Sequence, residues 1–133
     1  MTVDGSLPKP PLVYLVEDEP EIATTLSNVL RYGGCQVRTF LSGGDLLAYQ
    51  SDSPPDVVVT DYVMQPMDGV RLAGWVRSTW PQARVIMITG DEHLARSAAG
   101  YALPYTVMEK PLDSVKLIAR VHGIDLDEAE NCA

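Results

Sequence analysis

Five short apolar runs, separated by longer segments with helical spacing, constrain this chain to an alternating strand–helix fold. The runs lie at residues 12–16, 36–40, 56–60, 85–88 and 105–109. The first is wholly apolar and the third is rich in β-branched residues, as is typical of strands covered on both faces. Parallel strands need crossover helices between them. The pattern therefore predicts an α/β fold with a doubly wound, five-stranded parallel sheet.

The segments between the runs predict the crossover helices. Pro20 suits a first helical turn, Gly33 and Gly34 suit a helix end, and Asp68 can cap a helix that Pro81 stops. Helices are expected at about residues 20–31, 44–50, 68–80, 91–99 and 112–122.

The length and charge of the chain limit its organisation and its partners. The 133 residues suit one domain. We expect this domain at residues 12–123, between a flexible arm at 1–11 and an acidic tail at 124–133. The formal net charge of −8 argues against direct binding of nucleic acid or of an anionic membrane. The sequence has neither a long apolar run nor a secretory signal, so we expect a cytoplasmic protein.

Five polar residues come at the ends of the predicted strands. Glu17 and Asp18 follow the first strand, Asp61 the third, Thr89 the fourth and Lys110 the fifth. In an open parallel sheet, sites form beyond the carboxyl ends of the strands, so these side chains should meet at one edge. Three neighbouring carboxylates repel one another unless a cation joins them. Because every ligand offered is an oxygen, Mg²⁺ is the expected cation.

This set of groups suits one kind of chemistry. A carboxylate nucleophile, a divalent cation, a lysine and a hydroxyl suit phosphoryl transfer, which depends on positioning and charge neutralisation. Any one of these acids alone could be a solvated loop charge. Their coincidence at one edge favours a site.

Four stretches of the sequence carry a family resemblance. LVYLVEDEP, VVVTDYVMQPMDG, VIMITGDE and MEKPL occur in this order, each at the end of a predicted strand. Together they resemble bacterial response-regulator receiver domains of two-component signalling systems, whose fold is flavodoxin-like. The resemblance covers about residues 11–121 and implies a stand-alone receiver, since the chain offers little length for an output domain.

The resemblance implies a role for each residue of the set. Asp61 would accept a phosphoryl group as an acyl phosphate. Asp18, with Glu17 beside it, would bind Mg²⁺ together with Asp61, and the backbone carbonyl of Val63 would complete the metal shell. Thr89 would turn its hydroxyl toward the phosphoryl oxygens.

Lys110 would pair with the phosphoryl group, and Pro111 after it would follow a cis peptide bond, again by resemblance. At the position where the family often has Tyr or Phe, three residues before the lysine, this chain has Val107. Tyr105 lies two residues earlier, on the same face of the strand by period two. Tyr105 is therefore either a substitute for that aromatic residue or a packed strand residue.

The leading interpretation is a phosphorylation-dependent switch rather than a metabolic enzyme. The resemblance implies a sensor histidine kinase or phosphotransfer protein as donor and a further protein as target, which the sequence does not identify. It also implies an output face at the fourth helix, fifth strand and fifth helix, where homodimerisation is left open.

Three alternatives differ from this switch. A degenerate receiver would act as a scaffold without phosphorylation, and Val107 keeps this reading open. An aspartate-nucleophile phosphatase of the haloacid-dehalogenase type wants an acid two residues after the nucleophile, where this chain has Val63. A flavin-binding protein of similar fold would need a phosphate-binding loop, and none is obvious.

Overall fold

The computed structural model describes residues 9–49, 53–63, 67–91, 93 and 105–124. Strands and helices alternate along them: β1 (Leu12–Val16), α1 (Pro20–Tyr32), β2 (Gln36–Phe40), α2 (Gly43–Ala48), β3 (Val57–Asp61), α3 (Gly69–Thr79), β4 (Arg84–Thr89), β5 (Thr106–Glu109) and α5 (Ser114–Val121). Each strand coincides closely with a predicted apolar run. The helix expected at residues 91–99 falls largely outside the described residues.

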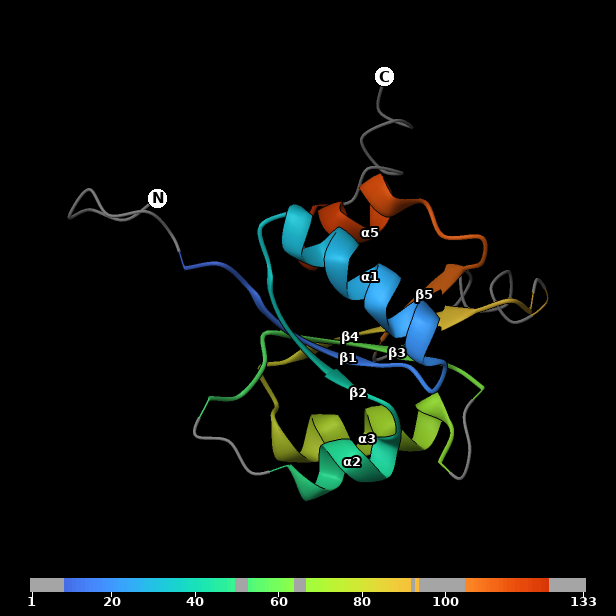
Figure 1. Cartoon of the computed structure of the whole chain (residues 1–133). Coiled ribbons are helices and arrows are strands. Elements are labelled where there is room, and N and C mark those ends of the chain that lie inside the picture. The colour runs from blue at the N-terminus through green and yellow to red at the C-terminus, as the bar shows by residue number, and fades with distance from the viewer. Residues whose placement is uncertain (1–8, 50–52, 64–66, 92, 94–104, 125–133) are drawn as a thin grey trace.

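The strands form a single parallel sheet in the order β2-β1-β3-β4-β5. Helices α1 and α5 cover one face of the sheet, and α2 and α3 cover the other (Figure 1). The chain therefore adopts the predicted doubly wound, flavodoxin-like fold, with β2 and β5 as edge strands. No helix in the described part of the chain combines the length and apolar character needed to cross a membrane.

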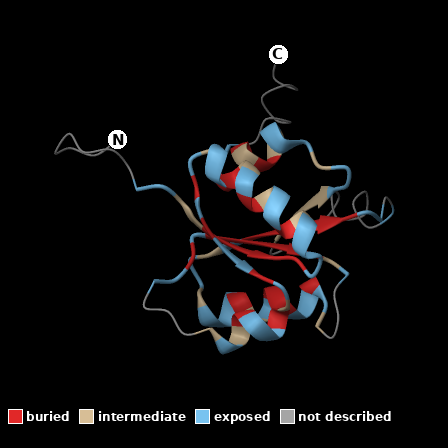
Figure 2. Cartoon of the chain, viewed as in Figure 1, coloured by how far each residue is buried: buried red, intermediate tan, exposed pale blue. Residues whose placement is uncertain are grey.

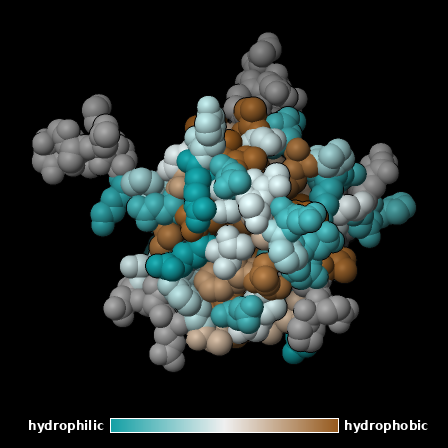
Figure 3. All heavy atoms as spheres, viewed as in Figure 1, coloured by the Kyte–Doolittle hydropathy of each residue, from teal (hydrophilic) through white to brown (hydrophobic). Residues whose placement is uncertain are grey.

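Two hydrophobic cores, one on each face, account for the continuous apolar runs. On β1, Val13 and Leu15 pack with residues of α1 and α5, whereas Tyr14 and Val16 pack with residues of α2 and α3. The central strands are buried on both faces, as the red strands in Figure 2 show. On the viewed surface, apolar side chains appear in small separate patches among polar ones (Figure 3).

Hydrogen bonds from capping side chains determine where α3 and α5 begin, and they locate these starts more accurately than the apolar spacing does. Asp68 accepts a hydrogen bond from the Arg71 amide at 2.9 Å, which confirms its predicted capping of α3. Asp113 caps α5 by accepting from the amide of Val115 at 2.9 Å. Helix α5 therefore begins at Ser114, so the predicted start at Leu112 was two residues early.

At the amino ends of the strands, Asp56 links three strands. Its carboxylate accepts from the Leu12 amide at 2.8 Å, and its backbone carbonyl accepts from the Arg84 amide at 3.0 Å.

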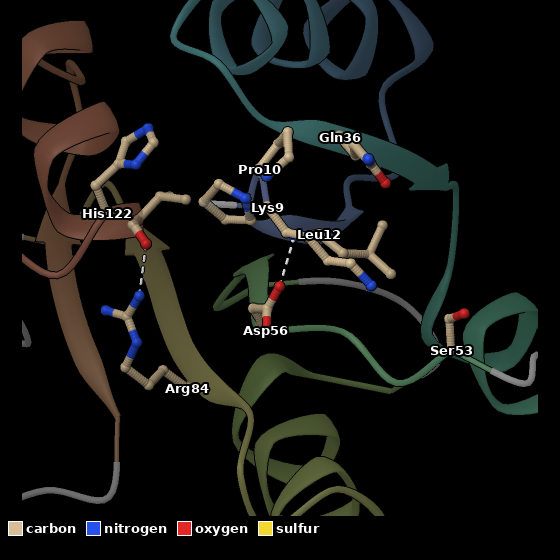
Figure 4. A pocket seen from close by; sticks show the side chains of 10 residues that line it. Lys9, Pro10, Leu12, Gln36, Ser53, Asp56, Arg84 and His122 are labelled. Carbon is tan, nitrogen blue, oxygen red and sulfur yellow. Dashed lines mark hydrogen bonds between the residues drawn. The ribbon is translucent and has the colours of Figure 1, made fainter. Parts of the chain in front are cut away.

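A hollow of about 600 Å³ opens beside Asp56 and is lined by Lys9, Gln36 and His122 among others (Figure 4). This edge has no cluster of carboxylates comparable with the opposite edge in the described part of the chain.

Ser27 on α1 is the one buried side chain whose hydroxyl has no hydrogen-bond partner in the described structure. An unpaired buried hydroxyl costs about 1–3 kcal/mol in desolvation, and alanine is the better helix former. We therefore expect Ser27→Ala to raise the free energy of unfolding by about 0.5–1.5 kcal/mol in urea titrations. A clear loss of stability would instead mean that the hydroxyl is hydrogen-bonded in solution.

Candidate functional site

The sheet brings the predicted site residues to its carboxyl edge. Strand β1 ends immediately before Glu17 and Asp18, and Asp61 is the last residue of β3. Thr89 is the last residue of β4, and Lys110 directly follows β5. The strand register keeps these ends level, because Asp61 pairs with Ile88 and the Lys110 amide donates to the Thr89 carbonyl at 2.7 Å.

Three carboxylates form a compact cluster at this edge. Glu17, Asp18 and Asp61 each place one carboxylate oxygen within 4.8 Å of the others. Glu17 and Asp61 are only 2% and 8% exposed, whereas Asp18 lies open to solvent. The cluster therefore has a buried floor and one accessible side, from which an ion or a donor molecule can enter.

The charges in the cluster are only partly balanced. Lys110 places its Nζ 3.2 Å from Oδ1 of Asp61. Burial raises the pKa of Glu17 to about 8, helped by a hydrogen bond and the charge of Asp61, while Lys110 acts in the opposite direction. Burial is the largest cause of this rise, and the charges of Asp61 and Asp18 add to it because like charges disfavour the ionised carboxylate. A divalent cation can supply the positive charge that would reduce the repulsion among these carboxylates.

The ligands present fit Mg²⁺. The cluster offers only carboxylate oxygens, and it is the one group of potential metal ligands found among the described residues. A hard cation that prefers oxygen and retains water suits a site with few carboxylates and an open side. Softer metals would favour Cys or His, and this cluster contains neither.

Thr89 and Val63 occupy different surroundings. Thr89 is buried, and its hydroxyl oxygen accepts a hydrogen bond from the Asp91 amide at 3.0 Å. This bond uses a lone pair, so the hydroxyl hydrogen can still be donated to another oxygen. Val63 lies two residues beyond Asp61 with its side chain 72% exposed. Its predicted role needs only the backbone carbonyl and stays a prediction.

Gly69 is a site residue to which the sequence analysis gave no role. A Cβ built on Gly69 would lie 2.4 Å from the backbone oxygen of Asp61 and 3.1 Å from the Cα of Tyr62. The Gly69 amide also donates to the Tyr62 carbonyl at 2.9 Å. The first turn of α3 therefore rests directly on the backbone that carries the Asp61 carboxylate, and only glycine permits this approach.

The structure separates the two readings of Tyr105. Tyr105 and Val107 both pack against the core beneath α2 and α3, so they share a face as predicted. The register pairs Thr106 with Ile86 and Glu109 with Thr89. Tyr105 thus lies four residues before the level of Thr89, about 13 Å along the strand. This separation favours the packed residue over the substitute. The peptide bond between Lys110 and Pro111 is cis, as the resemblance implied.

Comparison with known proteins assigns the family. The family model described as "Response regulator receiver domain" matches residues 13–122. The chain belongs to the response regulator receiver domains. This receiver domain has the sheet order, the acidic cluster and the position of the lysine described above. Two-component signalling is the process in which the family works, and its members are phosphoacceptors rather than classical enzymes.

The receiver domain is similar to parts of two curated proteins. It is 29% identical over 111 residues to the DNA-binding transcriptional regulator NtrC of Salmonella typhimurium, covering 83% of this chain and 24% of NtrC. It is 33% identical over 117 residues to the probable transcriptional regulatory protein TcrX of Mycobacterium tuberculosis, covering 87% of this chain and 50% of TcrX. The chain thus spans about a quarter of the length of NtrC and half of the length of TcrX.

The chemotaxis protein CheY4 of Vibrio cholerae shares the fold, with a TM-score of 0.73 and 24% identity over 86% of this chain and 98% of CheY4. That likeness concerns the fold alone. The site of the receiver domain is therefore argued from its own residues.

Proposed function

We propose that this receiver domain is a phosphorylation-dependent switch in which Asp61 accepts a phosphoryl group in a Mg²⁺-dependent reaction. The observation that carries the proposal is the position of the Asp61 carboxylate. It is nearly buried, lies within 4.8 Å of the Glu17 and Asp18 oxygens, and is 3.2 Å from the ammonium of Lys110. The proposed nucleophile, Asp61, therefore has two other carboxylates and the ammonium group of Lys110 close to it.

Each side chain has a distinct part in the proposed reaction. A carboxylate oxygen of Asp61 forms a bond to phosphorus while the bond from phosphorus to the donor breaks, and the donor group leaves. Lys110 balances the charge of the transferred phosphoryl group, and Thr89 donates its hydroxyl hydrogen to a phosphoryl oxygen. Glu17, Asp18, Asp61 and the Val63 carbonyl would hold Mg²⁺, which would supply positive charge to the phosphoryl oxygens.

The partners and the layout follow from this proposal. A sensor histidine kinase or a phosphotransfer protein supplies the phosphoryl group, and the phosphorylated domain binds a downstream protein with changed affinity. Residues 12–123 form the switching unit, preceded by the arm at 1–11 and followed by the acidic tail at 124–133. We place the protein in the cytoplasm, where such donors work.

Intact-protein mass spectrometry tests the proposal. After incubation with acetyl phosphate and Mg²⁺, we expect one phosphoryl adduct per chain, absent when EDTA removes the metal. Peptide mapping should place it on Asp61. A folded protein that forms no adduct over a long time course would contradict the switch and favour the unphosphorylated scaffold. Turnover of an added phosphomonoester would instead favour the phosphatase.

Lys110→Ala should slow the formation of the adduct by about 10–100-fold at saturating Mg²⁺, because a positioned cation is lost from the transferred group. The rate is measured by quenching samples over time and weighing the intact protein. Lys9→Ala is the control, since Lys9 lies at the opposite edge of the sheet. Equal rates in the two variants would remove Lys110 from the proposed reaction.

A further inference from the structure

Strand β2 is one edge of the parallel sheet, so one side of its backbone faces away from β1 (Figure 1). The Gln36 amide and the Phe40 carbonyl form hydrogen bonds of 2.9 Å with backbone groups immediately before and after β1. Because the backbone groups of a strand alternate in direction, the residues between them at odd positions point the other way. Val37 and Thr39 therefore turn their N–H and C=O groups outward, where a further strand could pair with them.

Arg31 occupies part of this outward side. It lies in the last turn of α1, and its Nη2 donates to the Val37 carbonyl at 3.1 Å. A strand added to the edge would have to bring a backbone N–H to the same oxygen. The guanidinium of Arg31 therefore stands where the backbone of an added strand would lie.

Arg38 places a second positive charge beside the same edge, on the other face of β2. The side chain of Val37 packs in the core beneath α1 and α5, whereas the Arg38 guanidinium lies 5.3 Å from the centroid of the Tyr49 ring on the α2 side. This distance allows a cation–π contact. Each arginine is thus held by a partner within its own chain, and the edge carries positive charge on both faces.

The shape of the surface does not protect this edge. A hollow of about 390 Å³ opens between α1 and β2, and its lining includes Ser27, Arg31, Thr39 and Leu41. Leu41, directly after β2, is 45% exposed. The hollow gives room for the side chains of an additional strand, so any protection has to come from the charged side chains.

We propose that Arg31 closes the β2 edge against strand pairing with a second copy of this chain, and that Arg38 opposes the same pairing. Exposed edge strands invite pairing with other chains, and charged side chains are a common protection against it. A second copy is the partner to exclude, because two β2 strands can pair antiparallel about a two-fold axis.

The pairing geometry explains why these two arginines matter. The register that uses every outward group places the axis at Arg38, so that Val37 of each copy pairs with Thr39 of the other. This register needs the Val37 carbonyl, which Arg31 already occupies. It also sets the two Arg38 side chains directly opposite each other, where like charges destabilise the pair. The inference involves no phosphoryl transfer, so its failure would leave the proposed function untouched.

The double variant Arg31→Ala/Arg38→Thr tests the proposal. Alanine favours helices and threonine favours strands, so each replacement suits its element. The loss of two positive charges changes the formal net charge from −8 to −10, which increases the general repulsion between copies. Association of this variant would therefore have to come from a specific contact.

Sedimentation equilibrium and solvent-exchange NMR measure the expected result. The average mass of the double variant should rise toward twice that of the monomer as concentration increases. Over the same series, exchange of the Thr39 amide should slow by about 10-fold or more, because pairing protects this outward N–H. Arg31→Ala alone should slow it in the same direction by less, and this variant decides the question if the double variant does not fold.

Arg71→Ala/Arg77→Ala is the matched control, because it removes the same charge from exposed positions of α3. In this control and in the original protein, exchange of the Thr39 amide should not depend on concentration. A folded double variant with the same independence would overturn the proposal. Association that leaves Thr39 exchange unchanged would also overturn it, since the contact would then lie on another surface.

Discussion

Asp61→Asn should abolish the phosphoryl adduct and reduce the stabilisation that Mg²⁺ gives to the protein. The substitution keeps the shape of the side chain but replaces one carboxylate oxygen by an amide nitrogen, which is neither a nucleophile nor a metal ligand. In the proposed switch, Asp61 is both the acceptor and one of three clustered carboxylates. We expect no adduct on this variant by intact mass, because the oxygen that would bond to phosphorus is lost.

Asp68→Asn is the matched control for this prediction. Asp68 is an exposed carboxylate seven residues from Asp61, and asparagine is as good an N-cap as aspartate. We expect it to form the adduct at the original rate and to keep the Mg²⁺-dependent rise in Tm. An adduct that persists in Asp61→Asn would place the acceptor elsewhere and remove the basis of the proposed function.

Gly69→Ala should destabilise the protein by about 2–4 kcal/mol, at the upper end for one added methyl group. The new Cβ would lie 2.4 Å from the Asp61 carbonyl oxygen, which is backbone and cannot rotate away. Either the first turn of α3 or the end of β3 must move. Because the end of β3 carries Asp61, we also expect slower adduct formation. Urea unfolding and intact mass measure the two effects.

Gly74→Ala provides the opposite expectation within the same helix. A Cβ at Gly74 meets no atom within 4 Å, so alanine brings only its higher helix propensity. We expect a gain of about 0.5–1 kcal/mol in the free energy of unfolding. If both substitutions changed stability alike, the close contact at Gly69 would not be the cause of its effect.

The fold was predictable because strands that are buried on both faces have a recognisable apolar pattern in the sequence. Strands covered on both faces must be apolar throughout, so runs such as Leu12–Val16 and the β-branched β3 stand out. The carboxyl ends of parallel strands share one edge by topology alone. The meeting of Glu17, Asp18 and Asp61 therefore followed from strand ends, and the structure confirms it.

Features that depend on distances across the fold were not predictable. The need for glycine at position 69 arises from the approach of α3 to β3, which no local pattern records. The raised pKa of Glu17 depends on its burial and on how close Asp61 lies. The start of α5 was wrong by two residues because apolar spacing continues through Leu112, whereas the cap bonds of Asp113 decide where the helix begins.

The position of the two tryptophans gives the protein a built-in optical reporter. Trp75 lies on α3 and Trp80 directly follows it, with ring centroids 5.0 Å apart and planes at 86°. The chain has no other tryptophan. All of its indole emission therefore originates from α3 and the residue that follows it. A change in the wavelength or intensity of that emission reports on the carboxyl end of the helix whose first turn rests on Asp61, without any added dye.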